Sequence, residues 1–261
     1  MENGFEGGNV TRRGFVGGLA LALFGVTGTA RGMGLSGSFS ARRLLTAGTP
    51  GPAERDTGLV RWGWELVRRT SAPARLTATT VGASDSALLK EPFVIWSGSK
   101  DVAPLIPAER RGLESFLRLG GILVVDDADP VSGQFSRAVR RELRQILPES
   151  PVSRLEPSHV LYKTFYLVPR PQGRLLGPER IDAIVRGTQA QVLFLACDLL
   201  GALSTKADGT FLFDTEPSAP RSREFAIRFA VNIAMYVLCS DYKDDQVHAP
   251  WLMRRRARWN P

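Results

Sequence analysis

Apolar residues recur along this chain in two patterns that alternate with each other. Residues 59–67, 113–117 and 135–146 carry apolar side chains every three or four positions, which predicts amphipathic helices. The runs 93–96, 122–125 and 191–197 are almost continuously apolar, as in strands that are covered on both faces of a sheet. Strands alternating with helices predict an α/β fold, with a mostly parallel central sheet covered by helices on both sides.

The longest apolar segment is residues 224–240, which is apolar on almost every side. Arg228 and Asn232 interrupt it near the middle, where a charged or amide group would be costly in lipid. We therefore expect a core helix packed on the sheet, with a membrane-spanning helix as the weaker alternative.

The N-terminus has the features of an export signal. Arg12 and Arg13 follow a polar residue and precede a glycine and an aromatic residue, which is the twin-arginine pattern. The apolar stretch 15–30 is rich in glycine and shorter than the ~18–20 residues that cross a bilayer. We predict a twin-arginine signal peptide over residues 1–30 with cleavage after Ala30. An uncleaved N-terminal membrane anchor, or a chance arginine pair before a buried helix, is the alternative.

Composition divides the rest of the chain into three parts. Residues 31–56 are rich in Gly, Ser, Ala and Pro without a period, which predicts a flexible linker. Residues 57–248 form a single α/β domain, within which the proline-punctuated stretch 152–177 is expected to be an irregular insertion over one edge of the sheet. Residues 249–261 form a basic C-terminal tail.

The net charge of the 261 residues is +8, carried mainly by arginine. Such a charge is compatible with polyanion binding, but it is also what an arginine-rich solvated surface gives. Export would remove the protein from nucleic acid, so no nucleic-acid partner is expected. Cys197 and Cys239 lie in apolar runs, where a small buried side chain or a disulfide would each be acceptable.

Candidate chemistry follows the apolar strands. Asp126 and Asp127 end one run and Asp198 follows another, so the carboxyl ends of parallel strands would bring them to one edge of the sheet, where ligands bind in open α/β folds. Asp129 and His159 are further candidates for this edge. Clustered carboxylates could bind a divalent cation, with Asp126, Asp127 and Asp129 as its ligands, or act as acid and base. The plainer alternative is that these aspartates cap helices and form turns.

Several complete motifs are missing from the sequence. It contains no G-x-S-x-G or G-x-C-x-G nucleophile elbow, no P-loop, no G-x-G-x-x-G after a strand and no H-E-x-x-H. Asp198 next to Cys197 opposes formation of a thiolate. No organic cofactor is therefore predicted.

Three segments carry a resemblance to a known family: LESFLRLGGILVVDDAD, SRAVRRELRQILPESPVSRLEPSHVLYKTFY and NIAMYVLCSDYKDDQVHAPWLMRRR. Together they resemble the bacterial domain of unknown function family 4159, from about Val60 to the C-terminus. The resemblance implies a three-layer sandwich similar to class I glutamine amidotransferase-like, flavodoxin-like domains. It also implies an exported or membrane-associated protein, often encoded near MoxR-type ATPases and von Willebrand factor A-type proteins. Asp126, Asp127 and His159 match the family pattern, but no known role comes with them.

Two functions are compatible with these observations. The first is a non-catalytic binding or assembly module of the cell envelope, periplasmic or facing the periplasm. It would have a degenerate amidotransferase-like fold and protein partners, and it would meet the twin-arginine translocase during export. The second is a metal-assisted hydrolase that uses the acidic cluster of Asp126, Asp127 and Asp198, with His159 as a further catalytic candidate.

Overall fold

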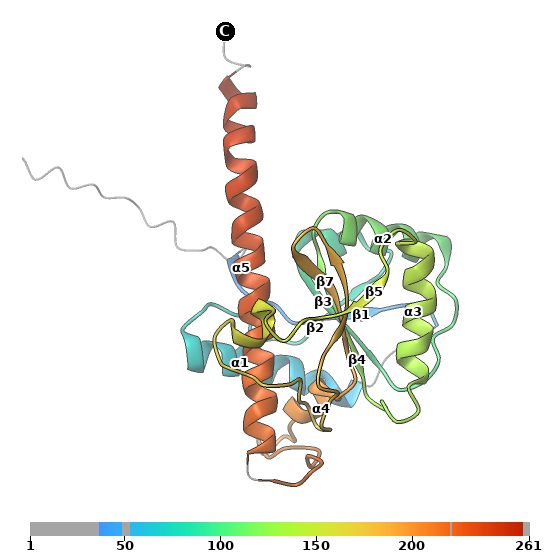
Figure 1. Ribbon diagram of the computed structural model, residues 1–261, viewed down its shortest axis with the longest axis vertical. Coiled ribbons are helices and arrows are strands. Elements are labelled where there is room, and N and C mark those ends of the chain that lie inside the picture. The colour runs from blue at the N-terminus through green and yellow to red at the C-terminus, as the bar shows by residue number, and fades with distance from the viewer. Residues whose placement is uncertain (1–36, 49–52, 220, 258–261) are drawn as a thin grey trace, which may run out of the picture. The chain divides into compact units, whose positions relative to one another are not determined.

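Seven strands form one sheet at the centre of the computed structural model, which describes residues 37–48, 53–219 and 221–257 and, in the last helix, side chains up to Ser240. The strand order is β2-β1-β3-β4-β7-β6-β5 (Figure 1). The strands are β1 (Arg42–Leu45), β2 (Thr79–Gly82), β3 (Phe93–Gly98), β4 (Ile122–Asp127), β5 (Val152–Arg154), β6 (Asp182–Arg186) and β7 (Gln189–Leu195).

The sheet is mixed. The expectation of a mostly parallel sheet needs correction at one edge, where the strands are antiparallel. Strands β2, β1, β3, β4 and β7 are parallel to one another, whereas β6 pairs antiparallel with both β7 and β5. Only Gly187 and Thr188 connect β6 to β7, and so short a connection can join only antiparallel strands. Gly187 has a φ of +60°, as the tight turn requires. The stretch 152–177, predicted to be an irregular insertion, begins with the edge strand β5.

Strand β1 corrects the predicted linker over residues 31–56. It lies inside the sheet between β2 and β3, so this part of the predicted linker belongs to the α/β domain. Arg42 and Arg43 conceal it in the sequence, because two consecutive arginines are unusual in a buried strand. Arg42 donates hydrogen bonds to the carbonyl groups of Ala87 and Glu91, each 2.8 Å long. Arg43 forms an ion pair with Asp56 at 2.7 Å.

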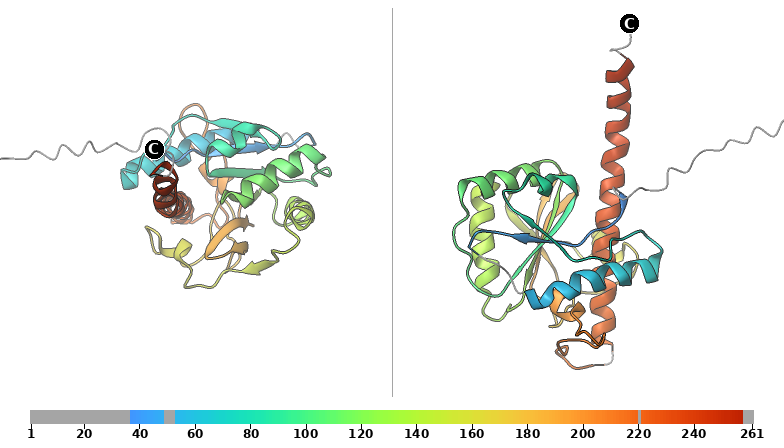
Figure 2. Two further views of the ribbon diagram at one scale, coloured as in Figure 1. Left: turned by 90° about the horizontal axis from the view of Figure 1, so that it is seen from above. Right: turned by 180° about the vertical axis from the view of Figure 1, so that it is seen from behind.

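Helices cover both faces of the sheet (Figures 1 and 2). One core cluster contains side chains of α1 (Asp56–Thr70), α4 (Leu199–Leu203) and α5 (Ser222–Ala257). The cluster on the other face contains side chains of α2 (Pro107–Arg118) and α3 (Gln134–Ile146). Three short 3₁₀ helices, η2 (Ala53–Arg55), η3 (Ser86–Lys90) and η4 (Val160–Lys163), lie in the connections. The expected α/β fold is therefore confirmed.

Trp62 fixes α1 against the core. Its side chain is fully buried, packs against the rings of Phe39 and Phe93, and donates a 2.8 Å hydrogen bond to the carbonyl oxygen of Ala230 in α5. This single residue thus joins α1, the segment before β1, strand β3 and α5.

The apolar segment 224–240 forms the core part of α5, as expected. Asn232 is fully buried, and its amide binds the backbone of η4 and the residues that follow it: Oδ1 accepts from Phe165 and Tyr166, and Nδ2 donates to Leu161 and Tyr166. In the part of the chain that the structure describes, no helix is long and apolar enough to cross a membrane.

The structure describes most of the C-terminal segment but not the N-terminal one. Arg12, Arg13 and Ala30 of the predicted signal peptide lie outside the described residues. The helix α5 continues to Ala257, so residues 249–257, expected to form a separate tail, extend the last helix of the domain.

Candidate functional site

The candidate carboxylates follow from the alternation of side chains along β4. Ile122 and Val124 belong to the core under α1, α4 and α5, whereas Leu123 and Val125 belong to the core under α2 and α3. Because successive side chains of a strand point to opposite faces, Asp126 and Asp127 at its carboxyl end are directed to opposite sides of the sheet. The pair that looks like one site in the sequence is therefore divided between two.

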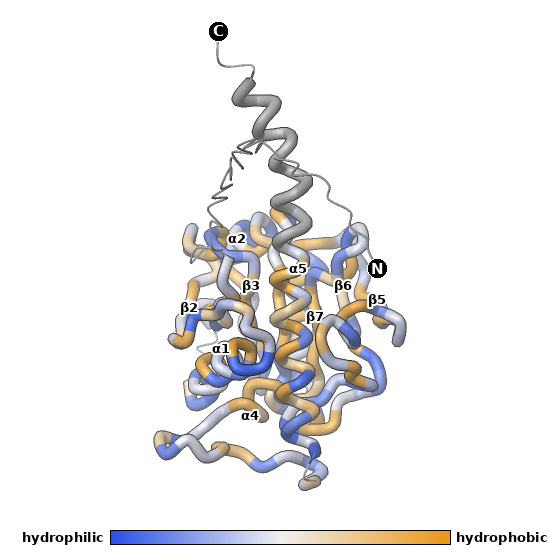
Figure 3. Tube along the Cα trace, turned by 90° about the vertical axis from the view of Figure 1, so that its left-hand side faces the viewer, coloured by the Kyte–Doolittle hydropathy of each residue, from blue (hydrophilic) through white to orange (hydrophobic). Residues whose placement is uncertain are grey.

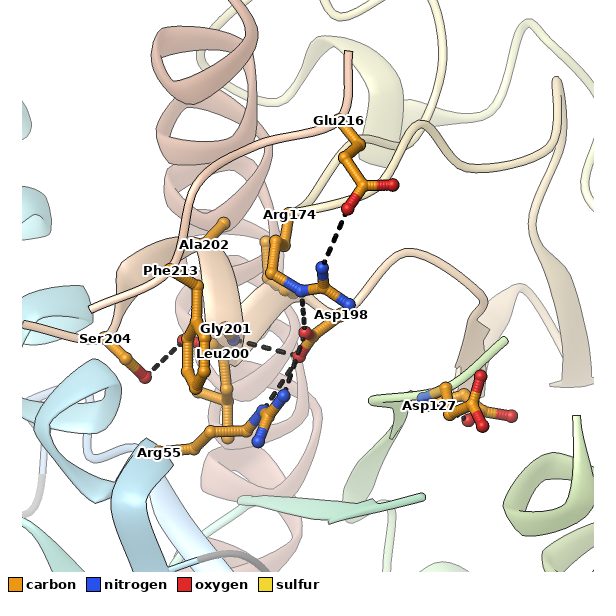
Figure 4. Close-up of polar contacts among 12 residues, drawn as sticks. Arg55, Asp127, Arg174, Asp198, Leu200, Gly201, Ala202, Ser204, Phe213 and Glu216 are labelled. Atoms are coloured by element: carbon orange, nitrogen blue, oxygen red, sulfur yellow. Dashed lines mark hydrogen bonds and ion pairs between the residues drawn. The ribbon is translucent and has the colours of Figure 1, made fainter. Parts of the chain in front are cut away.

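Asp198 occupies the sharp turn between β7 and α4. Its φ of +52° places it in the left-handed region, which residues other than glycine adopt rarely. Its side chain is fully buried and binds two arginines (Figure 4). Arg55 approaches both carboxylate oxygens, at 3.0 and 3.1 Å, and the Nε of Arg174 lies 2.6 Å from Oδ2.

Two glycines permit this turn to be so tightly packed. A Cβ on Gly173 would lie 2.2 Å from the carbonyl oxygen of Cys197, and one on Gly201 would lie 2.3 Å from Oδ2 of Asp198. The backbone N–H of Gly201 also donates to Asp198 at 3.1 Å. Any larger residue at either position would force the ion-pair cluster apart.

Asp126 lies beneath the same turn. Its two oxygens accept hydrogen bonds from the backbone N–H groups of Leu199 and Leu200, at 2.7 and 2.9 Å. Burial, followed by the nearby charge of Asp198, raises the pKa of Asp126 to about 7. Asp126 and Asp198 therefore both hold the first turn of α4, and they repel each other when both are ionised.

Asp127 has a different role on the other side of the sheet. Its oxygens accept from the N–H groups of Asp129 and Ser136, at 3.0 and 3.2 Å, so it orders the connection into α3. Burial raises its pKa. Asp129 in turn accepts from Ser132. Figure 4 shows Asp127 apart from the cluster around Asp198.

His159 does not join the carboxylates. It precedes η4, where its Nδ1 accepts a hydrogen bond from the N–H of Leu161 and its ring centroid lies 5.8 Å from that of Tyr236. Burial lowers its pKa. Among the residues that the structure describes, no three or more His, Cys, Asp and Glu side chains are grouped so that they could hold a metal ion.

Neither cysteine forms a disulfide. Cys197 is fully buried, and burial together with the charges of Asp126 and Asp198 raises the pKa of its thiol well above the ordinary value. Such a thiol stays protonated and is a poor nucleophile. Cys239 is an exposed free thiol.

Arg55 and Arg174 are the members of the cluster that sequence reasoning missed. Arg55 lies in the predicted linker and Arg174 in the predicted insertion, and neither follows a strand or belongs to a recognisable motif. Glu54 and Glu216 bind the outer parts of these arginines, at 2.9 and 3.5 Å. These two arginines could have been predicted from the fact that a buried carboxylate needs cationic partners. That argument requires knowing that Asp198 is buried, which the sequence does not show.

One family model matches residues 45–238, and its description reads Domain of unknown function (DUF4159). The chain belongs to this family. The part that matches the DUF4159 model begins at the last residue of β1 and ends within α5, so it contains the whole cluster of Arg55, Asp126, Arg174 and Asp198. A comparison with curated proteins found no match.

Replacing Asp198 with Asn tests how much of the fold depends on the cluster. Asn tolerates the left-handed backbone and keeps the size of the side chain, so mainly the charge is lost. Because Arg55 and Arg174 would lose their shared buried carboxylate, we expect the free energy of unfolding to fall by about 3–5 kcal/mol in urea titrations. The matched control, Glu149→Gln at an exposed pair, should leave the midpoint unchanged. A loss for Asp198→Asn as small as that of the control would contradict a central structural role.

The raised pKa of Asp126 predicts how stability depends on pH. Between about pH 4 and pH 7 the folded protein keeps a proton on Asp126 that the unfolded chain releases, so this group makes the protein less stable as the pH rises through 7. The slope from one such group approaches about 1.4 kcal/mol per pH unit. Asp126→Asn should flatten the decline between pH 5 and 8 in urea titrations, even if its overall stability is lower. The lowered pKa of His159 acts in the opposite direction and cannot imitate this effect. Equal slopes in the wild type and the variant would refute the assignment.

Proposed function

We propose that this protein is a non-catalytic binding or assembly module of the bacterial cell envelope. One observation carries the proposal: the turn between β7 and α4 presents Asp198, and two arginines neutralise that side chain inside the protein. In α/β enzymes with a nucleophile elbow, such a turn exposes the reactive residue at the edge of the sheet. Here the same position serves the stability of the fold.

The strand order supports the proposed relationship to amidotransferase-like, flavodoxin-like domains. The five parallel strands follow the order β2-β1-β3-β4-β7, which has the same pattern as the flavodoxin-like order 2-1-3-4-5. The pair β6 and β5 would then be an addition at one edge. Within this relationship, Cys197 is no substitute for the missing nucleophile, because its side chain is buried and its pKa is raised.

The hydrogen bonds of the carboxylates favour a binding module over a metal-assisted hydrolase. Asp126 and Asp127 each accept two backbone N–H groups, and Asp198 accepts one and binds two guanidinium groups. A divalent cation at Asp126, Asp127 and Asp129 would have to displace several of these donors. It would also have to bring together side chains that point to opposite faces of the sheet.

Gentle purification from the native host tests the binding function. Full-length tagged protein should bring down at least one envelope protein in a near-stoichiometric amount, and products of a MoxR and von Willebrand factor A-type gene cluster are the first to look for. Asp127 lies on the other side of the sheet from the Asp198 cluster. Asp127→Asn should retain this partner, because the proposed binding function does not depend on a reaction at the acidic edge. Recovery of the wild-type protein without any partner above background would count against the proposal.

Export by the twin-arginine route is the second part of the proposal, and it rests on the sequence of residues 1–30. Arg12→Lys/Arg13→Lys should abolish transport of a reporter fused behind residue 56, because the translocase reads the arginine pair as an address. Arg31→Lys in the same fusion keeps the Arg12–Arg13 pair, so it serves as the control and should leave export unchanged. A reporter that is still exported after the double substitution would exclude this route.

A further inference from the structure

The outer side of α1 carries apolar side chains that the core does not use. The inner side buries Leu59, Trp62 and Leu66, as expected from the spacing. Val60, Trp64 and Val67, spaced by four and three residues, form a second stripe on the same helix. Trp64 is 38% exposed and Val67 is 39% exposed. A helix with one buried stripe needs no second one for its own packing.

A neighbouring segment widens this stripe. Gly63 lies on the same side of α1 as Val60 and Val67, and a Cβ at that position would lie 3.3 Å from Cδ2 of Leu76. Leu76 is itself 47% exposed. Leu76 therefore lies beside the stripe at the position of Gly63. We call the side chains of Val60, Trp64, Val67 and Leu76 the α1 patch. Figure 3 shows α1 beside α5, with hydrophobic and hydrophilic positions next to each other along the helix.

Arginines border the α1 patch on one side. The guanidinium carbon of Arg61 lies 4.5 Å from the ring centroid of Trp64, and that of Arg68 lies 4.9 Å from it. These cation–π contacts hold the indole in place, so that binding to it would cost little conformational entropy. An ordered Trp beside Arg is the composition of energetic hot spots in protein interfaces.

The charges around the α1 patch indicate what kind of partner it fits. Arg61 forms an ion pair with Glu65 at 2.6 Å, so its charge is compensated. Arg68 stacks on Trp64, and within the described part of the chain it forms no ion pair. One uncompensated guanidinium can bind one carboxylate, whereas a nucleic acid or an anionic membrane would require several cations.

We propose that the α1 patch is the docking site for a protein partner. The partner would place an apolar side chain on Val60, Trp64 and Val67, and an adjacent Asp or Glu on Arg68. The two valines lie about 10 Å apart along the helix axis, so a short helical or extended segment of the partner suffices. This inference rests on the proposed binding function and adds to it a surface and a class of partner.

Photo-crosslinking in the full-length chain tests the α1 patch. The probe, p-benzoylphenylalanine, is placed at Val67 and, as the matched control, at Leu119, which is 73% exposed at the end of α2 on the other side of the sheet. We expect an adduct with a partner protein at position 67 and none at position 119. Mass spectrometry of the linked peptide should find Asp or Glu next to the linked residue.

Two further substitutions show whether the contact is the one proposed. In the position-67 background, Trp64→Ala and Arg68→Glu should each lower the yield of adduct at least about tenfold. Arg68→Lys keeps the charge and should lower it less. Thermal unfolding checks that each variant remains folded, since Trp64 and Arg68 are surface residues whose loss should affect stability little.

The alternative outcomes separate this inference from the proposed function. If the partner still co-purifies with Trp64→Ala, or if no adduct forms at position 67, the docking site is wrong and the binding function stands. A position-67 adduct with lipid, with a second copy of this chain, or with a segment that lacks a carboxylate would also overturn the proposed class of partner. If the wild type has no partner, the proposed function itself fails, and the docking site fails with it.

Discussion

The buried carboxylate of Asp198 connects parts of the chain that are remote in sequence. Arg55 comes from the connection between β1 and α1, Arg174 from the loops before β6, and Asp198 from the turn after β7. A buried charge is tolerated only when it is paired and hydrogen-bonded, so the folded edge of the sheet depends on all three segments together. Gly173 and Gly201 make room for this arrangement, and Asp126 secures the same turn of α4 from below.

This constraint explains how an edge rich in carboxylates is compatible with the proposed binding function. A reactive carboxylate or thiol needs an accessible position and a pKa suited to its task. Asp198 and Cys197 are both fully buried, and Asp127 is engaged in ordering the connection to α3. The polar groups of the edge thus hold its loops in place. The free surface of the domain is then the more promising place for recognition. The outer side of α1 combines exposed apolar area, an ordered indole and a cation that has no ion pair among the described residues.

Helix α1 has a double role in this view. Its inner side is held by Trp62, which contacts two rings and a carbonyl group of α5. Its first residue, Asp56, pairs with the buried Arg43 of β1. Because the helix is held at its first residue and near its middle, its outer side is presented on a fixed element, which is what a recognition surface requires.

Local patterns determined much of the architecture. The apolar runs predicted β3, β4 and β7, the helical spacing predicted α1, α2 and α3, and the polar Asn232 in an apolar helix indicated a protein core instead of a membrane.

The same patterns failed for β1, because Arg42 and Arg43 can be buried only when distant carbonyl groups and Asp56 accept their hydrogen bonds. They failed for β5 and β6 because short, polar edge strands have little periodicity to detect. The sequence also predicted Asp126, Asp127 and Asp198 at one edge of the sheet, because strands that alternate with helices are expected to be parallel and so to end at the same edge. Only the tertiary structure decided what these carboxylates do: their partners, Arg55 and Arg174, are 143 and 24 residues from Asp198 along the chain, and pairing over such separations depends on how the whole chain packs.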